Sequence, residues 1–245
     1  MAHGTSSLRT GRTLGAFLLS AAALVGCAGA SNDGAVGAQT DDTESEALSA
    51  TSDAYVTVTR DPRDCMGPRC GGYWVRKVNT CAREVYASQL DLAPLAWSAE
   101  QNAVVLATPP DELVLRGHLG AADAKYGTRA LVVTAAYRGG SGLRAGAKDV
   151  VVAVSPRTPR VECITAPCPQ WTAQPMNKGA SAATFFDRVD VSAAVGPRHD
   201  AASLTDSVEH EGALVAGTFV AGAAFPGGRE RVLDASQVFV HLPEL

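Results

Sequence analysis

Alternating apolar and polar positions recur along the chain beyond residue 54 and predict short, half-buried β-strands. The alternation and the β-branched runs place strands at 55–59, 73–78, 84–91, 112–119, 130–138, 150–154, 185–191, 213–220 and 231–242. Runs rich in Gly and Ala at 120–127 and 221–228 predict turns between later strands. The pattern indicates a mainly β protein whose strands fall into two groups.

One helix interrupts the strands in each group. Ser98 is followed three residues later by Gln101, which is the capping-box pattern that begins a helix. This helix is predicted to run to about Ala107 and to end before Pro109. Residues 200–208 are its counterpart in the second group. The first group therefore has the element order β-β-β-α-β-β, which the second group is expected to share.

The two groups also match in sequence, which predicts an internal duplication. Their first parts share the pattern Pro-Arg-x₁₋₂-Cys-x₄-Cys-x₂-(Tyr or Trp)-x₅-Asn, and the copies lie 98 residues apart. The residue pairs at this spacing are Cys65 and Cys163, Cys70 and Cys168, Tyr73 and Trp171, and Asn79 and Asn177. Farther along the chain the offset drifts to 102, which loop insertions explain.

The expected fold is mainly β with minor α, built as two tandem units over 54–147 and 148–245. The element order is that of an OB-fold barrel, so two OB-like barrels are the first interpretation. An α+β sandwich, or one sheet merged from both units, would give the same order of elements. The order alone leaves these three arrangements open.

The N-terminus has the features of an export signal. Arg9 and Arg12 precede an apolar stretch over 14–26, which is too short for the roughly 20 residues of a membrane-spanning helix. The stretch ends in Leu24-Val25-Gly26-Cys27, which resembles the lipobox of bacterial lipoproteins. The resemblance implies a signal peptide over 1–26, cleavage before Cys27 and a lipid on its sulfur. The alternative is an incidental cysteine in a plain signal peptide.

Composition and charge refine this picture. Residues 27–53 carry six acidic residues, no Lys or Arg and no aromatic residue, which predicts a disordered acidic tether. Without the signal peptide, this segment accounts for the whole net negative charge of the chain. The rest is balanced, so nucleic acid is not an expected partner. Ala28 after the cysteine favours the outer over the inner membrane of the bacterial cell envelope, by analogy with lipoprotein sorting.

Five cysteines remain besides Cys27. Export favours two local disulfides, Cys65–Cys70 and Cys163–Cys168, because exported proteins meet an oxidising environment. The rival arrangement is a zinc site that pools these four thiolates. Cys81 has no counterpart in the second unit. It would be an unpaired thiol, a bridge to a second copy in a dimer, or a competitor for Cys65 or Cys70.

No catalytic motif stands out, and a non-enzymatic binding or structural module without cofactor or metal is expected. Its partners would be the membrane, through the lipid, and a protein or a glycan. The expected binding surface combines the cysteine loops with neighbouring side chains, namely Arg69, Tyr73, Trp74 and Trp171. A protease inhibitor that presents disulfide-braced proline loops, and a hydrolase of unrecognised type, are the alternatives. Asp91 and Asp190, at the ends of strands, are expected to cap turns.

The first unit contains the sequence Cys-x₄-Cys-Gly-Gly-Tyr over 65–73. In this motif the chain resembles uncharacterised bacterial lipoproteins with such a repeat. The resemblance covers residues 55–138 well and 150–242 less well. It implies an envelope lipoprotein and no particular activity.

Overall fold

The computed structural model describes residues 48–63, 67, 70–141, 145–146, 148–158, 162–210 and 212–242. The predicted signal peptide, the lipidation site Cys27, Cys65 and Arg69 lie outside the described residues. Residues 40–245 belong to one compact unit. Within the described residues, no helix combines the length and the apolar character that crossing a bilayer requires.

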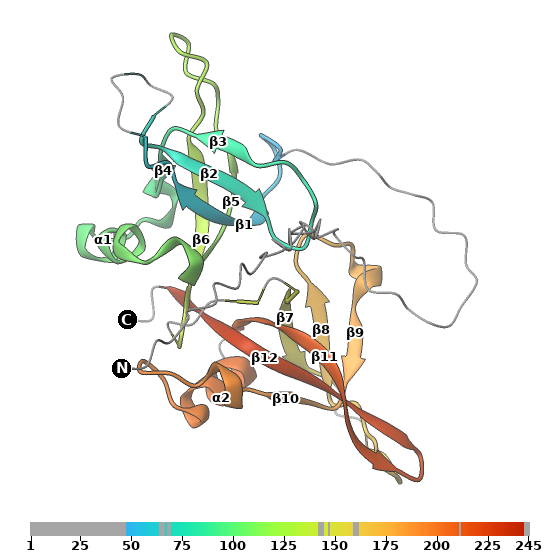
Figure 1. Ribbon diagram of the computed structural model, residues 1–245. Coiled ribbons are helices and arrows are strands. Elements are labelled where there is room, and N and C mark those ends of the chain that lie inside the picture. The colour runs from blue at the N-terminus through green and yellow to red at the C-terminus, as the bar shows by residue number, and fades with distance from the viewer. Residues whose placement is uncertain are drawn as a thin grey trace, which may run out of the picture. The chain divides into compact units, whose positions relative to one another are not determined.

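The described residues form a mainly β fold with two α-helices, as the alternation predicts (Figure 1). The strands are β1 (Ala54–Arg60), β2 (Tyr73–Lys77), β3 (Val85–Ala87), β4 (Leu90–Asp91), β5 (Leu113–Leu119), β6 (Leu131–Gly139), β7 (Val150–Pro156), β8 (Trp171–Pro175), β9 (Thr184–Phe186), β10 (Arg188–Asp190), β11 (Leu214–Phe225) and β12 (Gly228–Leu242). The helices are α1 (Ala99–Ala107), α2 (Ala201–His210) and the short 3₁₀ turns η1 (Ala93–Leu95), η2 (Pro110–Glu112), η3 (Ala180–Ala182) and η4 (Ser192–Ala194).

All twelve strands belong to one sheet, in the order β3-β2-β1-β5-β6-β12-β11-β7-β8-β9, with β4 beside β6 and β10 beside β12. The sheet is open, and all pairings are antiparallel except β4–β6 and β10–β12. The two predicted units are joined where β6 pairs with β12. Of the three arrangements left open by the element order, the merged sheet is the one present. The first five strands of this order correspond to the last five in reverse, as two copies of one unit would require. The duplication itself stays a prediction.

Each half of the sheet curls back on itself. In the first half β3 pairs with β2, and only Ser88 and Gln89 separate β3 from β4, which pairs with β6. One continuous stretch of chain thus touches both ends of the first half-sheet. In the second half β9 and β10 do the same with β8 and β12. The single strand predicted over 84–91 is split at Ser88 because its two ends pair with different neighbours.

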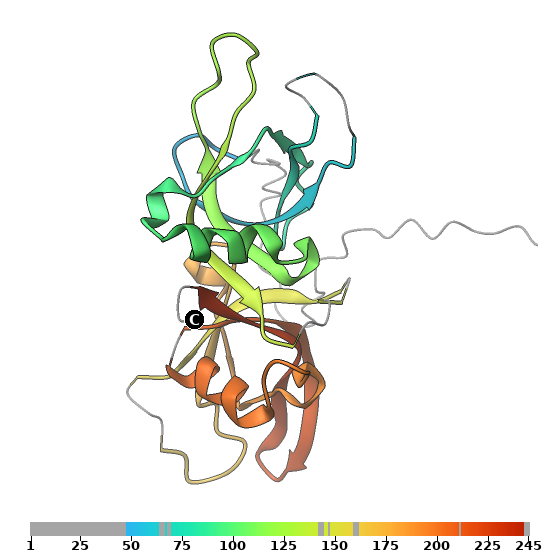
Figure 2. The same cartoon turned by 90° about the vertical axis from the view of Figure 1, so that its left-hand side faces the viewer.

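Helix α1 has the bounds that its end signals predict. The Ser98 hydroxyl accepts a hydrogen bond from the Gln101 backbone N–H at 3.3 Å, and the Gln101 side chain accepts one from the Ser98 backbone N–H at 2.9 Å. The helix ends at Ala107, before the proline pair. Both helices lie on the same side of the sheet and face the viewer in Figure 2. Val105 of α1 is buried in the core of the first half, and Leu204 of α2 in that of the second.

Two boundaries differ from the sequence prediction. Strands β11 and β12 continue to Phe225 and from Gly228, so most of the turn predicted over 221–228 is strand. Glycine and alanine are poor strand formers by themselves, but pairing between the two strands overrides this preference and extends them. The end of the predicted tether also belongs to the fold. Leu48 is buried in the first core, and the Ser49 carbonyl accepts a hydrogen bond from the Leu119 backbone N–H.

Two asparagines join the halves by a reciprocal set of hydrogen bonds. The Asn79 amide donates to the Val151 carbonyl at 2.6 Å and to the Met176 carbonyl at 3.0 Å, while its oxygen accepts from the Val151 N–H at 2.8 Å. Asn177 repeats the arrangement in the opposite direction, with Tyr55 in the place of Val151. Its amide donates to the Tyr55 carbonyl at 2.7 Å and to the Val78 carbonyl, which corresponds to that of Met176, at 3.0 Å.

Both asparagines have the left-handed backbone conformation, with φ of 56° at Asn79 and 59° at Asn177. Asparagine tolerates this conformation better than other residues with a Cβ. An apolar cluster lies around the junction and takes members from both halves. They are Val78, Val114, Ala135, Tyr137, Val151, Met176, Leu214, Ala216 and Phe239. The two half-sheets are therefore held together by β6–β12 pairing, by this cluster and by the two asparagines.

We expect Asn79→Ala to lower the free energy of unfolding by about 2–3 kcal/mol, because it removes three hydrogen bonds and leaves the Val151 N–H without its acceptor. Asn79→Gly is the matched control for the backbone, since it relieves the left-handed strain of alanine by about 1 kcal/mol while losing the same hydrogen bonds. Urea unfolding of both variants measures this. A loss below about 0.5 kcal/mol for Asn79→Ala would contradict the role of the asparagine.

Candidate functional site

An open groove of about 550 Å³ lies in the first half. Its lining combines two aromatic rings, two guanidinium groups and apolar side chains, with Gly127 and Thr128 on one wall. The lining residues are Arg63, Trp74, Val85, Tyr86, Leu119, Gly127, Thr128 and Arg129. We call these residues the β3 groove. The volume is within the range of ligand-binding sites.

The fold forms this groove by leaving one edge of β3 open. β3 is the last strand on the sheet path and pairs with β2 on its other edge. Just after β3, the Ser88 N–H donates to the Arg129 carbonyl at 2.8 Å, and the Leu131 N–H donates to the Gln89 carbonyl at 2.9 Å. Along β3 itself, no such backbone bonds to 127–129 occur among the described residues. The two segments therefore meet at Ser88 and part beyond it, and the groove lies between them.

Two aromatic side chains form one wall of the groove. Trp74 on β2 and Tyr86 on β3 are cross-strand neighbours, and their rings meet edge to face with centroids 5.4 Å apart. The Tyr86 hydroxyl accepts a hydrogen bond from the Gly72 N–H at 3.1 Å. A Cβ at Gly72 would lie 2.3 Å from the Ala87 carbonyl oxygen, so only glycine fits there. The glycine before Tyr73 in the cysteine motif is thus explained by the close approach of β3.

Arg63 forms the entrance of the groove and is held in place by Asp61. The guanidinium donates two bonds from Nε, at 2.9 and 3.0 Å, and one from Nη2 at 2.7 Å to the Asp61 carboxylate, which is almost fully buried. These hydrogen bonds keep the pKa of Asp61 below its ordinary value. The guanidinium carbon of Arg63 lies 5.8 Å from the centre of the Trp74 ring. Sequence reasoning missed this pair, although Asp-Pro-Arg directly precedes the cysteine loop.

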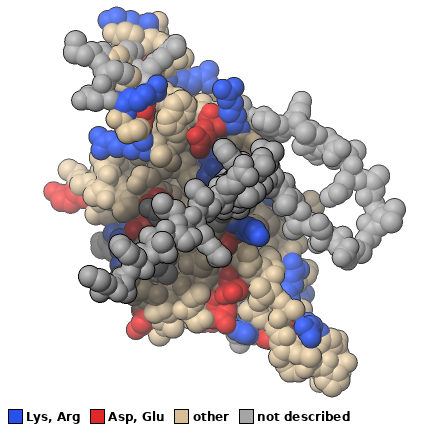
Figure 3. All heavy atoms as spheres, viewed as in Figure 1, with Lys and Arg blue, Asp and Glu red and all other residues tan. Residues whose placement is uncertain are grey.

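The surface around the groove is positively charged. Exposed basic side chains gather over the end of the first half where β2, β3 and the β5–β6 loop lie, and few acidic ones interrupt them (Figure 3). Arg129 is exposed and makes no ion pair among the described residues. Asp123, the acidic residue of the β5–β6 loop, uses its carboxylate to accept the backbone N–H groups of Lys125 and Tyr126. The groove therefore attracts negative charge.

The corresponding place in the second half is closed. Phe219 occupies on β11 the position of Leu119 on β5, and its ring packs against Phe186 with centroids 5.6 Å apart. The Arg231 guanidinium covers the Phe219 ring at 4.4 Å. The Asp187 carboxylate accepts the Arg231 N–H at 2.7 Å and so continues the contact between the two segments. The second half thus carries side-chain contacts at this place that the first half lacks, although β9, like β3, is an end strand of the sheet path.

The side chains of the predicted binding surface separate in the structure. Trp74 lines the β3 groove, but Tyr73 points to the opposite face of β2 and packs against the core of the first half. Trp171 packs against the core of the second half, where its ring stacks on Phe186 with centroids 6.4 Å apart. It also lines a smaller cavity of about 180 Å³. Of the four predicted residues, only Trp74 is therefore placed in the groove, and Arg69 lies outside the described residues.

The cysteines form disulfides. Cys163 is bonded to Cys168, with their Cα atoms 5.7 Å apart, as predicted. Cys70 and Cys81 are also disulfide-bonded, and no cysteine among the described residues is free. The prediction of an unpaired Cys81 is therefore wrong, as is the four-thiolate zinc site, because three of its four sulfurs, those of Cys70, Cys163 and Cys168, are in disulfide bonds. The Cys65–Cys70 pairing stays a prediction.

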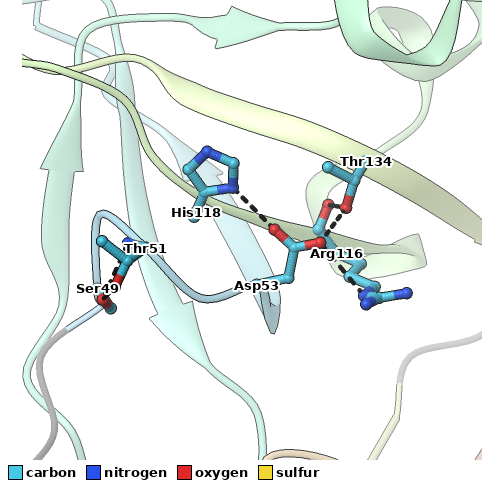
Figure 4. Close-up of polar contacts among 6 residues, drawn as sticks. All are labelled: Ser49, Thr51, Asp53, Arg116, His118 and Thr134. Carbon is cyan, nitrogen blue, oxygen red and sulfur yellow. Dashed lines mark hydrogen bonds and ion pairs between the residues drawn. The ribbon is translucent and has the colours of Figure 1, made fainter.

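A second polar cluster lies on β5 and β6 of the first half (Figure 4). The Asp53 carboxylate faces His118 Nδ1 at 2.8 Å and accepts a hydrogen bond from the Thr134 hydroxyl at 2.7 Å. Arg116 lies 3.5 Å away. The three residue types are those of a hydrolase triad, but the hydroxyl bonds to the carboxylate and not to the imidazole. A nucleophile activated by histidine needs the other order.

The second half repeats the Asp–hydroxyl pair. Thr134 is the extra residue of a β-bulge on β6, and its hydroxyl also contacts the Arg116 carbonyl at 3.3 Å. Ser236 is the extra residue of the bulge on β12, and its hydroxyl donates to Asp149 and to the carbonyl opposite it. In each half, the aspartate directly before the first strand accepts a hydrogen bond from the hydroxyl group of the bulge residue. We call this contact the bulge clasp. The repetition, together with the geometry, assigns the pair a structural role.

Asp91 and Asp190 also act as turn groups, as predicted. The Asp91 carboxylate accepts the Ala93 N–H at 3.1 Å at the start of η1. The Asp190 carboxylate accepts the Ser192 N–H at 3.1 Å and its hydroxyl at 2.7 Å. These bonds, with a further one from Arg188, lower the pKa of Asp190 to about 2.

The clasp predicts a pH dependence of stability. Burial raises the pKa of Asp53, but hydrogen bonds from His118 and Thr134 and the charge of Arg116 outweigh it, so the folded pKa lies below the unfolded one. The stability that Asp53 contributes is therefore complete above the unfolded pKa of about 4 and is lost as the pH falls through the folded value.

We expect the difference in unfolding free energy between the wild type and Asp53→Asn to shrink as the pH is lowered from about 6 towards 3. Denaturant unfolding at a series of pH values measures it. Thr134→Val, which removes one of the hydrogen bonds, should show an intermediate slope. A difference that stays constant over this range would show that the clasp does not hold the carboxylate ionised.

With the fold and the groove described, comparison with known proteins adds one finding. No curated protein and no solved structure matches the chain. A family model described as "Domain of unknown function (DUF6748)" matches residues 54–244, which include every strand and both helices. As that model spans most of the chain, the protein belongs to the DUF6748 domain family.

Proposed function

We propose that the protein is a lipid-anchored binding module of the bacterial cell envelope, without catalytic activity, and that it binds a protein partner in the β3 groove. The lining of the groove carries the proposal. Trp, Tyr and Arg are the residue types that dominate binding energy at protein interfaces, and the groove brings together Trp74, Tyr86, Arg63 and Arg129. Its guanidinium groups and its strand edge favour a protein over a glycan as the partner.

The anchor is supported by the order of segments along the chain. The signal-like stretch and Cys27 come first, then an acidic segment, and the DUF6748 domain begins at residue 54. A flexible spacer of about 20 residues would have a span of roughly 25 Å, enough to hold the domain clear of lipid headgroups. Ala28 after the cysteine favours the outer membrane.

A non-enzymatic role is supported by the use of the polar groups. The cluster that contains Asp53, His118 and Thr134 is arranged as a clasp on a bulge, and the second half has the same clasp without a histidine at the equivalent place. The Asp61 carboxylate is paired with the Arg63 guanidinium. These polar groups therefore organise the frame and the entrance of the groove.

Photo-crosslinking of the full chain in its native cells tests the proposal. We expect a photoreactive amino acid at Thr128, in the groove, to give an adduct of one defined mass, and Trp74→Ala to reduce that adduct about tenfold. The same group at Phe225, an exposed residue of the second half, is the positional control. Phe185→Ala is the matched aromatic control, because Phe185 occupies on β9 the place of Tyr86 on β3.

Equal adducts from Thr128 and Phe225, or an adduct that Trp74→Ala leaves unchanged, would contradict binding in the groove. The melting temperature of Trp74→Ala shows whether the variant keeps its fold. Trp74→Phe should retain part of the adduct, since it preserves an aromatic face.

A second candidate function, protease inhibition, is favoured by one observation. Ile164 is fully exposed on the loop that the Cys163–Cys168 disulfide closes. The tip of the β11–β12 hairpin supports this loop, because a Cβ at Gly227 would lie only 2.7 Å from the Ala166 carbonyl oxygen. A covalently closed and supported loop is preorganised to present a side chain to a protease.

For this candidate we expect inhibition of proteases that accept aliphatic side chains, with an inhibition constant at or below about 1 µM, and its loss in Ile164→Asp. Enzyme assays with the purified full chain measure it, with trypsin-like proteases as a test of Arg69. Absence of inhibition by the wild type at micromolar concentration would remove this candidate and leave binding in the groove untouched.

A further inference from the structure

We infer that the partner enters the β3 groove as an extended peptide segment that adds a strand to the open edge of β3 and presents a carboxylate to Arg129. This inference rests on the proposed binding function and specifies its partner. Strand addition is a recurrent mode of peptide recognition, in which main-chain bonds supply affinity and side-chain contacts supply specificity.

The direction of the backbone groups on β3 supports strand addition. Alternate residues of a strand direct their N–H and C=O groups to opposite sides. The Ser88 N–H points away from β2, since it donates to the Arg129 carbonyl. Tyr86, two residues earlier, therefore directs its N–H and C=O to the same outer side. There they have no strand partner among the described residues, so an incoming strand would find a donor and an acceptor in the groove.

The opposite wall leaves room for that strand. It consists of Gly127, Thr128 and Arg129. Gly127 has a positive φ of 65° and nothing within 4 Å of where a Cβ would stand, so this wall is open at backbone level. An added strand needs about 4.8 Å from its neighbour, and the existing contact at Ser88 already sets the direction in which such a ladder would continue. The site is therefore a gap in a sheet as well as a pocket.

In the second half, side chains surround the place that corresponds to the groove. The equivalent of Tyr86 is Phe185, and the Arg157 guanidinium lies 4.3 Å above its ring. Beyond it, Asp187 bonds to the Arg231 N–H, and Arg188 bonds to Glu230 at 3.1 Å. These contacts occupy side chains at the edge of β9, whereas β3 has an open groove beside its edge. We therefore place strand addition at β3.

Charge complementarity identifies the side chain that the segment should carry. Arg63 already holds Asp61, whereas Arg129 has no acidic partner among the described residues. Trp74, Val85 and Leu119 supply apolar and aromatic surface in the same groove. An extended segment with one Asp or Glu beside apolar residues matches both features. A Lys-rich or Arg-rich segment would be repelled by the positive end of the molecule.

A phage library of random linear peptides of about eight residues, selected on the full chain in detergent micelles, tests the inference. We expect the selected peptides to be rich in Asp or Glu among apolar residues. In the complex, hydrogen exchange of the Tyr86 amide should slow by about tenfold or more, because that amide gains an acceptor. Arg129→Glu should weaken binding about tenfold, and Arg157→Glu, a control arginine beside Phe185 in the second half, by less than about twofold.

The outcomes separate the inference from the function on which it rests. Peptides that lose binding in Trp74→Ala but leave the exchange of the Tyr86 amide unchanged would overturn strand addition while keeping the groove as the binding site. Peptides that bind regardless of Trp74, or a library without any binder, would also overturn it, and the photo-crosslink at Thr128 would then decide the proposed function on its own.

Discussion

The reciprocal hydrogen bonds of Asn79 and Asn177 join the main chains of the two halves of the sheet. Each side chain acts as a short piece of backbone, since it donates to and accepts from the main chain of the other half. The left-handed conformation at both positions ends β2 and β8 and directs the amides across the junction. The two halves also meet along β6 and β12, in an apolar cluster and through the ion pair of Arg198 with Glu112, and the asparagines add hydrogen bonds to the main chain across this junction.

Curvature within each half follows from a second repeated device. An extra residue on β6 and on β12 bends the strand, and a hydroxyl group at that residue binds an aspartate placed directly before β1 or β7. The bend brings β4, which follows β3 in the chain, into pairing with β6. This pairing closes one end of the first half-sheet. The groove exists because this closure stops at Ser88, where the backbone contact with Arg129 ends. Its position is therefore a consequence of the frame.

Local signals predicted the elements well, whereas long-range pairing was beyond them. Helix α1 was predictable because Ser98, Gln101 and the proline pair act within one turn of chain. The bonds of Asn79 and Asn177 reach residues 72 to 122 positions away, and no local pattern reports such a contact. For the site, Trp74 was identified as an aromatic residue near the cysteine loop. Tyr86 and Arg129 were missed because they join the groove only once β3 and the β5–β6 loop meet.

The contrast between the halves carries the strongest argument about function. Both halves of the sheet have corresponding strands, a bulge bound by an aspartate and an asparagine at the junction, so this frame does not require a groove beside β3. In the second half the Asp187 carboxylate accepts the Arg231 backbone N–H, and the Arg231 guanidinium covers the Phe219 ring. In the first half Leu119, Ser88 and Arg129 stand at these places and leave the main chain of Tyr86 accessible. An exposed strand edge is a liability that folded proteins normally cover, and this chain contains the means to cover it. An edge that has an open groove beside it, as β3 has, is what a binding site built from a sheet edge would require.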